Sequence, residues 1–86
     1  MKLTYDPRAD AAYLLMGEPL VRGQVASTYL CDPSEIDGMI NLDFDKEGRL
    51  LGIEILDASK RLAPSVLSLA VPYGTARGNP RAARSR

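Results

Sequence analysis

Residues 49–62 read RLLGIEILDASKRL, and this stretch decides how the rest of the chain is interpreted. Its first half, residues 50–56, is apolar except at Gly52 and Glu54. A half-buried strand alternates apolar and polar residues, whereas a strand that is covered on both faces is apolar almost throughout. We therefore predict that this apolar run forms the central strand of a sheet.

Four more strands are predicted upstream, at residues 2–5, 11–16, 20–31 and 39–45. The first two flank the sequence DPRAD, in which Pro7 is typical of an early turn position. The third is rich in β-branched and aromatic residues, although Gly23 interrupts it. The fourth alternates clearly, with Ile40, Leu42 and Phe44 on one face and polar residues on the other.

The sequence DKEG at residues 45–48 predicts a hairpin between the fourth strand and the central strand. Asp in the first position and Gly in the fourth are typical of a type I turn followed by a glycine bulge, which would place Phe44 opposite Leu50. The hydrophobic pattern instead pairs Leu42 with Leu51 and Ile40 with Ile53. Because a one-residue slip moves every side chain to the opposite face, we favour the register that the hydrophobic pattern predicts.

Prolines set the bounds of the predicted helical turns. Pro33 begins either a loop or a single helical turn after the third strand. Pro64 would cost about 3 kcal/mol inside a helix, so we predict one turn at residues 58–62, with Asp57 at its N-cap, and a second short helix at residues 64–70. The apolar residues of both are spaced to form one buried stripe: Leu62, Val66, Leu67 and Ala70.

These elements predict an α+β fold, a small antiparallel β-meander of about five short strands with a C-terminal helical segment packed on one face. Residues 1–74 would form a single globular domain. Residues 75–86 contain no apolar side chain larger than alanine, and we expect them to be a disordered basic tail.

The small size of the chain favours association. A domain of 86 residues buries only about 60–65 per cent of its unfolded surface, so its stability is marginal. Its single cysteine cannot form an internal disulfide, and without histidine the usual zinc sites are not available. We therefore expect a homo-oligomer, or a complex with another protein, to supplement the core.

The sequence offers no signal of a membrane or secreted protein. No apolar run approaches the roughly 18 residues that cross a bilayer. The N-terminus, MKLTYDPRAD, reaches charge and proline before any apolar region of a signal peptide. We expect a cytoplasmic protein with no membrane partner.

The net charge of zero conceals an acidic body and a basic tail. All eleven carboxylates lie at or before Asp57, whereas four of the eleven basic residues lie near the C-terminus: Arg77, Arg81, Arg84 and Arg86. Such a tail could bind nucleic acid or an acidic partner through its charge. It has no aromatic residues for base stacking, and a solvated tail is the simpler interpretation.

Three blocks of the sequence resemble the small prokaryotic domain-of-unknown-function family numbered 2283: YDPRADAAY at residues 5–13, LDFDKEG at residues 42–48 and GIEILDASKRL at residues 52–62. The resemblance extends over about residues 1–67. It implies a small β-meander with a C-terminal helical segment, and it implies no activity. Because some members lie beside toxin-like genes, it also implies an antitoxin-like or partner-binding role. The chain departs from the family pattern between residues 17 and 38 and in its basic tail.

Catalytic chemistry has little support in the sequence. Without histidine there is no imidazole for general acid–base work or for a catalytic triad, and no phosphate-binding glycine loop is present. The remaining constellation is Asp43, Asp45 and Glu54, which could share a sheet face and hold a divalent cation or act as an acid and base. The simpler interpretation places Asp43 and Asp45 on the solvated face of an amphipathic strand. Glu54, if buried, needs a partner such as Lys60, Arg61 or a neighbouring subunit.

Two functions from different classes follow. The favoured one is a non-enzymatic protein-interaction or self-assembling module, of the antitoxin-like kind that the resemblance implies, with no catalytic residue, cofactor or metal. The alternative is a small carboxylate-based, metal-dependent hydrolase that uses Asp43, Asp45 and Glu54.

Overall fold

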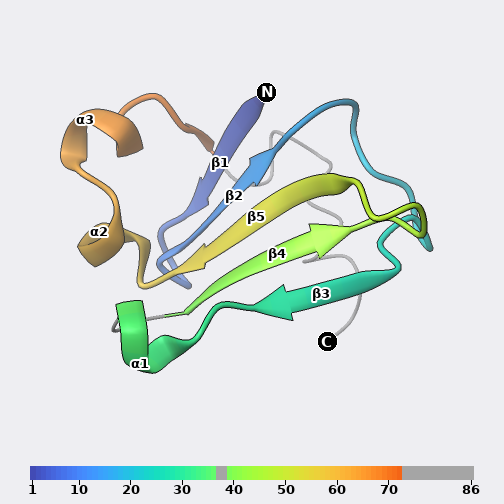
Figure 1. Ribbon diagram of the computed structural model, residues 1–86. Helices are drawn as coiled ribbons and strands as arrows, with labels where there is room; N and C mark the ends of the chain where they lie inside the picture. The colour runs from blue at the N-terminus through green and yellow to red at the C-terminus, as the bar shows by residue number, and fades with distance from the viewer. Residues whose placement is uncertain (37–38, 73–86) are drawn as a thin grey trace.

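The computed structural model describes residues 1–36 and 39–72 as a twisted sheet with three short helices (Figure 1). In chain order its elements are β1 (Lys2–Asp6), β2 (Ala11–Leu15), β3 (Ser27–Leu30), α1 (Pro33–Ile36), β4 (Ile40–Phe44), β5 (Leu50–Leu56), α2 (Ala58–Arg61), α3 (Pro64–Leu67) and β6 (Val71–Pro72). The predicted basic tail and the predicted end of the domain at residue 74 lie outside the described residues, as do Arg77, Arg81, Arg84 and Arg86.

The strands form one sheet in the order β3-β4-β5-β2-β1-β6. The first five strands of the chain pair antiparallel, and β6, which the sequence did not predict, pairs parallel with β1. The α+β class is confirmed, and β5 lies between β4 and β2 as the predicted central strand. The strand order also refines the predicted meander, because the chain crosses from β2 to the edge strand β3 before β4 and β5 return to β2.

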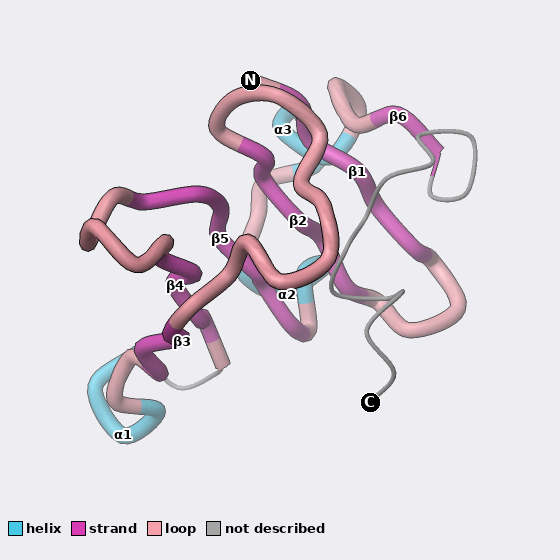
Figure 2. Tube along the Cα trace, turned by 90° about the vertical axis from the view of Figure 1, so that its right-hand side faces the viewer, coloured by secondary structure: helices cyan, strands magenta, loops and turns pink. Residues whose placement is uncertain are grey.

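The third strand is much shorter than predicted. Only Ser27–Leu30 of the predicted residues 20–31 form a strand. The preceding residues turn instead: the backbone N–H of Gln24 donates to the carbonyl of Val21, and Gly23 has φ +88°. Figure 2 shows the resulting loop between β2 and β3, which runs past the ends of β5 and β4. Turn chemistry at Gly23 therefore prevailed over the β propensity of its neighbours.

In the hairpin between β4 and β5, the turn determines the register near residues 45–48. Gly48 has φ +83° and its N–H donates to the carbonyl of Asp45, as expected for a type I turn with a glycine bulge. Phe44 lies opposite Leu50, as this turn predicts. The favoured pairings of Leu42 with Leu51 and of Ile40 with Ile53 are wrong, because Leu42 lies opposite Ile53 and Ile40 opposite Ile55.

Beyond the turn, a second bulge changes the register of β4 against β5 and brings their apolar side chains onto the same face. Between Asp43 and Phe44 the register shifts by one residue, so that Leu42 lies opposite Ile53. Without this shift, Leu42 would share a face with Gly52 and Glu54. The bulge therefore returns the apolar side chains of β4 and β5 to a common face.

The register gives the sheet one apolar face and one polar face. The apolar face carries Leu3, Tyr5, Ala12, Leu14, Ile53, Ile55, Ile40, Leu42 and Tyr29. The opposite face, called the polar face, carries Thr4, Tyr13, Gly52, Glu54, Asn41, Asp43 and Thr28, together with Leu15 and Leu30.

The two C-terminal helices cover only part of the apolar face. Figure 1 shows α2 and α3 together at one end of the sheet, beside β1, β2 and β5. The buried cluster of Ala12, Ile55 and Ala58 lies there, and Leu62 and Leu67 pack against it. The predicted helical segment on one face is thus confirmed. However, α3 ends at Leu67 rather than at residue 70, and Val66 of the predicted buried stripe is 38% exposed.

Candidate functional site

Asp43 lies at the centre of a buried polar cluster on the polar face of the sheet. Its side chain is fully buried. The phenol of Tyr13 on β2 donates a hydrogen bond of 2.9 Å to Asp43 Oδ2, and the hydroxyl of Thr28 on β3 donates one of 2.6 Å to Asp43 Oδ1. The prediction that Asp43 lies on a solvated face is therefore wrong, because this carboxylate joins strands from both sides of β5.

Gly52 makes the long reach of Tyr13 possible. Asp43 lies opposite Gly52 on β5, so the phenol must pass over this glycine to reach the carboxylate. A Cβ atom at Gly52 would overlap the phenol of Tyr13, and the ring carbon Cε2 would lie only 2.6 Å from it. Gly52 interrupts the apolar run of the central strand because the close approach of Tyr13 leaves no space for a side chain.

Glu54 lies next to this cluster and shares its face. The side-chain amide of Asn41 donates to Glu54 Oε1 at 3.0 Å from the directly opposite position on β4. Arg61 donates from Nη1 to the carbonyl of Ile36, which connects α2 to α1. An amide on the neighbouring strand is therefore one partner of Glu54.

Asp45 belongs to the hairpin turn rather than to the polar face. Its carboxylate accepts hydrogen bonds from the backbone N–H groups of Glu47 and Arg49 and from the Arg49 guanidinium. These interactions, the Arg49 N–H first among them, lower the pKa of Asp45. Of the three predicted carboxylates, the fold therefore brings together Asp43 and Glu54 and separates Asp45.

The described residues contain no group of three or more His, Cys, Asp and Glu side chains that could hold a metal ion. Asp43 receives two hydroxyl donors, and Asp45 is held by its own turn. The oxygen atoms of these two carboxylates, which a cation would need as ligands, therefore already accept hydrogen bonds from protein donors.

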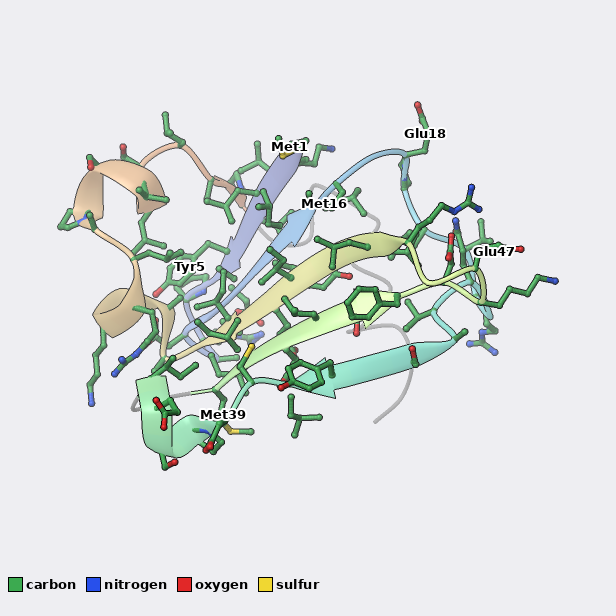
Figure 3. All side chains as sticks on the ribbon, in the orientation of Figure 1. Met1, Tyr5, Met16, Glu18, Met39 and Glu47 are labelled. Carbon is green, nitrogen blue, oxygen red and sulfur yellow. The ribbon has the colours of Figure 1, made fainter. Side chains whose placement is uncertain are left out.

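A second polar cluster connects the turn between β1 and β2 to α2. The carboxylate of Asp10 accepts hydrogen bonds from the Tyr5 phenol at 2.7 Å and from the Ser59 hydroxyl at 2.7 Å, and the Ser59 backbone N–H also donates to it at 3.0 Å. The carbonyl of Asp10 accepts from the N–H of Ala58. Figure 3 shows Tyr5 next to α2, where it can make this connection.

Asp10 caps α2 in place of the residue that the sequence predicted. Asp57 occupies the N-cap position, but it has φ +55° and makes no side-chain capping bond. Asp10 supplies the carboxylate from 49 positions away in the sequence, and the hydrogen bonds from Ser59 and Tyr5 lower its pKa. The bond to Asp10 in turn raises the pKa of Tyr5.

Both clusters draw most of their residues from the blocks that the sequence singled out, and Thr28 lies outside them. Tyr5, Asp10 and Tyr13 belong to the first block, Asp43 to the second, and Gly52 and Ser59 to the third. The sequence contained the residue types but not the contacts, because each cluster joins segments that are far apart in the chain.

A family model described as protein of unknown function, DUF2283, matches residues 2–59. The matched segment contains β1 to β5, the start of α2 and every residue of the two polar clusters. No curated protein and no solved structure matches the chain. Within residues 1–36 and 39–72, no helix is long and apolar enough to span a membrane.

Proposed function

The chain belongs to DUF2283, a family of unknown function, and from its own geometry we propose that it is a non-enzymatic protein-interaction module that self-assembles. The observation that carries this proposal is a row of apolar side chains that crosses the sheet without a covering layer among the described residues. The row consists of Leu3, Leu14, Ile53, Leu42 and Tyr29, which follow one another in register on five neighbouring strands. We call it the open row.

The open row contrasts with the row beside it. In the neighbouring row, Ala12 is 2% exposed and Ile55 is 7% exposed beneath the helical segment. In the open row no side chain is buried: the first four are half-buried and Tyr29 is 60% exposed. Ile53 is only half-buried although it lies on the central strand. An apolar row at the middle of a sheet normally packs against another layer.

Exposed apolar side chains also lie on the opposite face of the sheet, at the edge strand and at the end of β4. Leu30, which lies opposite Asn41, is 57% exposed, and Met39, which precedes Ile40, is 42% exposed. Figure 3 shows Met39 at the end of β4, next to α1. Burying apolar surface contributes about 25 cal/mol per Å², so association that reduces the exposure of the open row would supplement a small core. A second copy of the chain would do so in a homo-oligomer, and another protein would do so in an antitoxin-like complex.

The hydrolase alternative receives less support. Asp43 and Glu54 share a face, but both accept hydrogen bonds from protein side chains, and Asp45 lies in the turn. Calorimetric titration with a divalent cation would separate the two proposals.

Light scattering over a range of protein concentrations tests the proposed function. We expect the mean mass to rise with concentration, and we expect Tyr29→Glu to keep the chain monomeric because it adds a charge at the most exposed position of the open row. The control is Leu69→Glu, because Leu69 is 77% exposed but lies outside the open row. A parent chain that stays monomeric throughout, or equal effects of the two substitutions, would contradict self-assembly through this surface.

A further inference from the structure

The two edges of the sheet differ in their protection against pairing. One edge is β6, which has only two residues, one of which is Pro72. Short length and proline are devices that protect a sheet edge from other strands. The other edge is β3, whose sequence STYL has neither charge nor proline. Among the described residues, β3 pairs with β4 alone.

The backbone of β3 presents hydrogen-bonding groups along this edge. The N–H of Cys31 donates to the carbonyl of Ile40 on β4, so Cys31 is directed inward. Along an antiparallel strand, inward and outward residues alternate. Leu30 and Thr28 therefore direct their N–H and C=O groups away from β4, to the outer side of the sheet.

We propose that two copies of the chain pair antiparallel through β3, with Tyr29 opposite the partner's Tyr29. In this register Thr28 lies opposite the partner's Leu30, so that the outward N–H and C=O groups of both residues form hydrogen bonds across the edge. The proposal rests on the proposed function, and it specifies which surface two copies share.

A second copy fits this edge because the segment is complementary to itself. A two-fold axis at Tyr29 brings each outward donor of one copy to an outward acceptor of the other. Ser27–Leu30 contains no charge, so the pairing places no like charges opposite one another. The exposed side chains of Tyr29 and Leu30 would contact side chains of the second copy, Tyr29 on the apolar face of the joined sheet and Leu30 on the polar face.

The pairing also joins the open rows. The axis is perpendicular to the sheet, so the apolar faces of the two copies lie on the same side. Tyr29 ends the open row in each copy, and the two rows therefore become one continuous apolar row. An edge of four residues gives a small interface, and small interfaces belong to weak complexes. We expect dimers that form with rising concentration rather than permanent ones.

Disulfide trapping tests the register. Directly opposite residues in a non-hydrogen-bonded antiparallel pair have Cα atoms about 4.5 Å apart, which a disulfide can span. In a chain whose only cysteine is removed by Cys31→Ser, Tyr29→Cys should form a covalent dimer with oxidised glutathione. Ser27→Cys in the same background is the matched control and should remain mostly monomeric, because the two Ser27 residues are four positions out of register. Equal trapping of the two variants would overturn the register.

Light scattering of Leu30→Pro tests the edge hydrogen bonds. Proline removes the outward N–H of Leu30 and leaves the bonds between β3 and β4 in place, while Leu30→Thr, the control, keeps the N–H and loses the apolar side chain. Circular dichroism of both variants checks the fold. We expect Leu30→Pro to lose association and Leu30→Thr to retain a measurable part of it. A folded Leu30→Pro variant that associates like the parent would overturn the edge dimer and leave the proposed function intact, whereas a monomeric parent would overturn both.

Discussion

Asp43 shows how far the environment of one residue can depart from its place in the sequence. It alternates with apolar residues on β4, which is typical of a solvated polar face, yet its carboxylate is fully buried. The alternation predicted the correct face. It could not predict the burial, because this depends on Tyr13 from β2 and Thr28 from β3, which meet Asp43 only in the folded sheet.

Asp43→Ala should destabilise the domain by about 2–4 kcal/mol, because the buried Tyr13 phenol and the half-buried Thr28 hydroxyl lose their acceptor and an unmet buried donor costs about 1–3 kcal/mol. The control is Glu47→Ala, whose side chain is 54% exposed in the hairpin turn and whose loss should change stability by less than about 0.5 kcal/mol. Chemical denaturation of both variants measures the difference. Similar small losses for the two would mean that the Asp43 cluster does not hold the strands together.

At the scale of elements, the sequence predicted most strands and both C-terminal helical turns because each depends on local residues. The central strand followed from an apolar run, and the helix break followed from Pro64. The hairpin register was harder, because the turn and the hydrophobic pattern favoured different pairings. The turn predicted the pair of Phe44 with Leu50, whereas the hydrophobic pattern predicted only the common face, because a bulge between Asp43 and Phe44 places Leu42 opposite Ile53.

The attachment of α2 to the turn between β1 and β2 could not be predicted from local residues. Its capping carboxylate comes from Asp10, in the turn between β1 and β2, where the sequence indicated only a turn residue. Asp10 has φ +52°, a conformation that Asp and Asn tolerate better than most residues. This turn and the start of α2 belong to two separate blocks of the resemblance, and only the fold places Asp10 against Ser59.

This attachment should depend on pH. The pKa of Asp10 is lower in the folded chain than its ordinary value, so its ionised form stabilises the fold above about pH 4 and this contribution is lost as the pH falls through the folded-state pKa. Asp10→Asn keeps a residue that tolerates positive φ but removes the charge. We expect it to lower the melting temperature at neutral pH, with a smaller difference from the parent at about pH 3.

Asp32 and Asp45 also have lowered pKa values, so the parent and the variant should share the remaining acid sensitivity. Thermal unfolding of the two proteins across this pH range provides the measurement. A difference that stays constant with pH would show that the charge of Asp10 does not hold α2.

For the whole molecule, the length of the chain predicted a core too small for high stability without association, and the sheet supplies a physical reason for this expectation. The helical segment is too short to cover the apolar face, so Leu14, Ile53, Leu42 and Tyr29 remain at least partly exposed. The sequence indicated that the central strand is apolar on both faces. It did not indicate that the exposed row would end at an unprotected edge, because strand order depends on the crossover from β2 to β3.

Amide hydrogen exchange at Leu30, followed by NMR as a function of protein concentration, tests association through β3 most directly. The Leu30 N–H is directed to the outer edge of the sheet, whereas the Tyr29 N–H is directed to β4 and serves as the internal reference. We predict that exchange at Leu30 is fast in dilute solution and slows as the concentration rises, while exchange at Tyr29 is slow throughout. Exchange at Leu30 that is equally fast at every concentration would contradict the account.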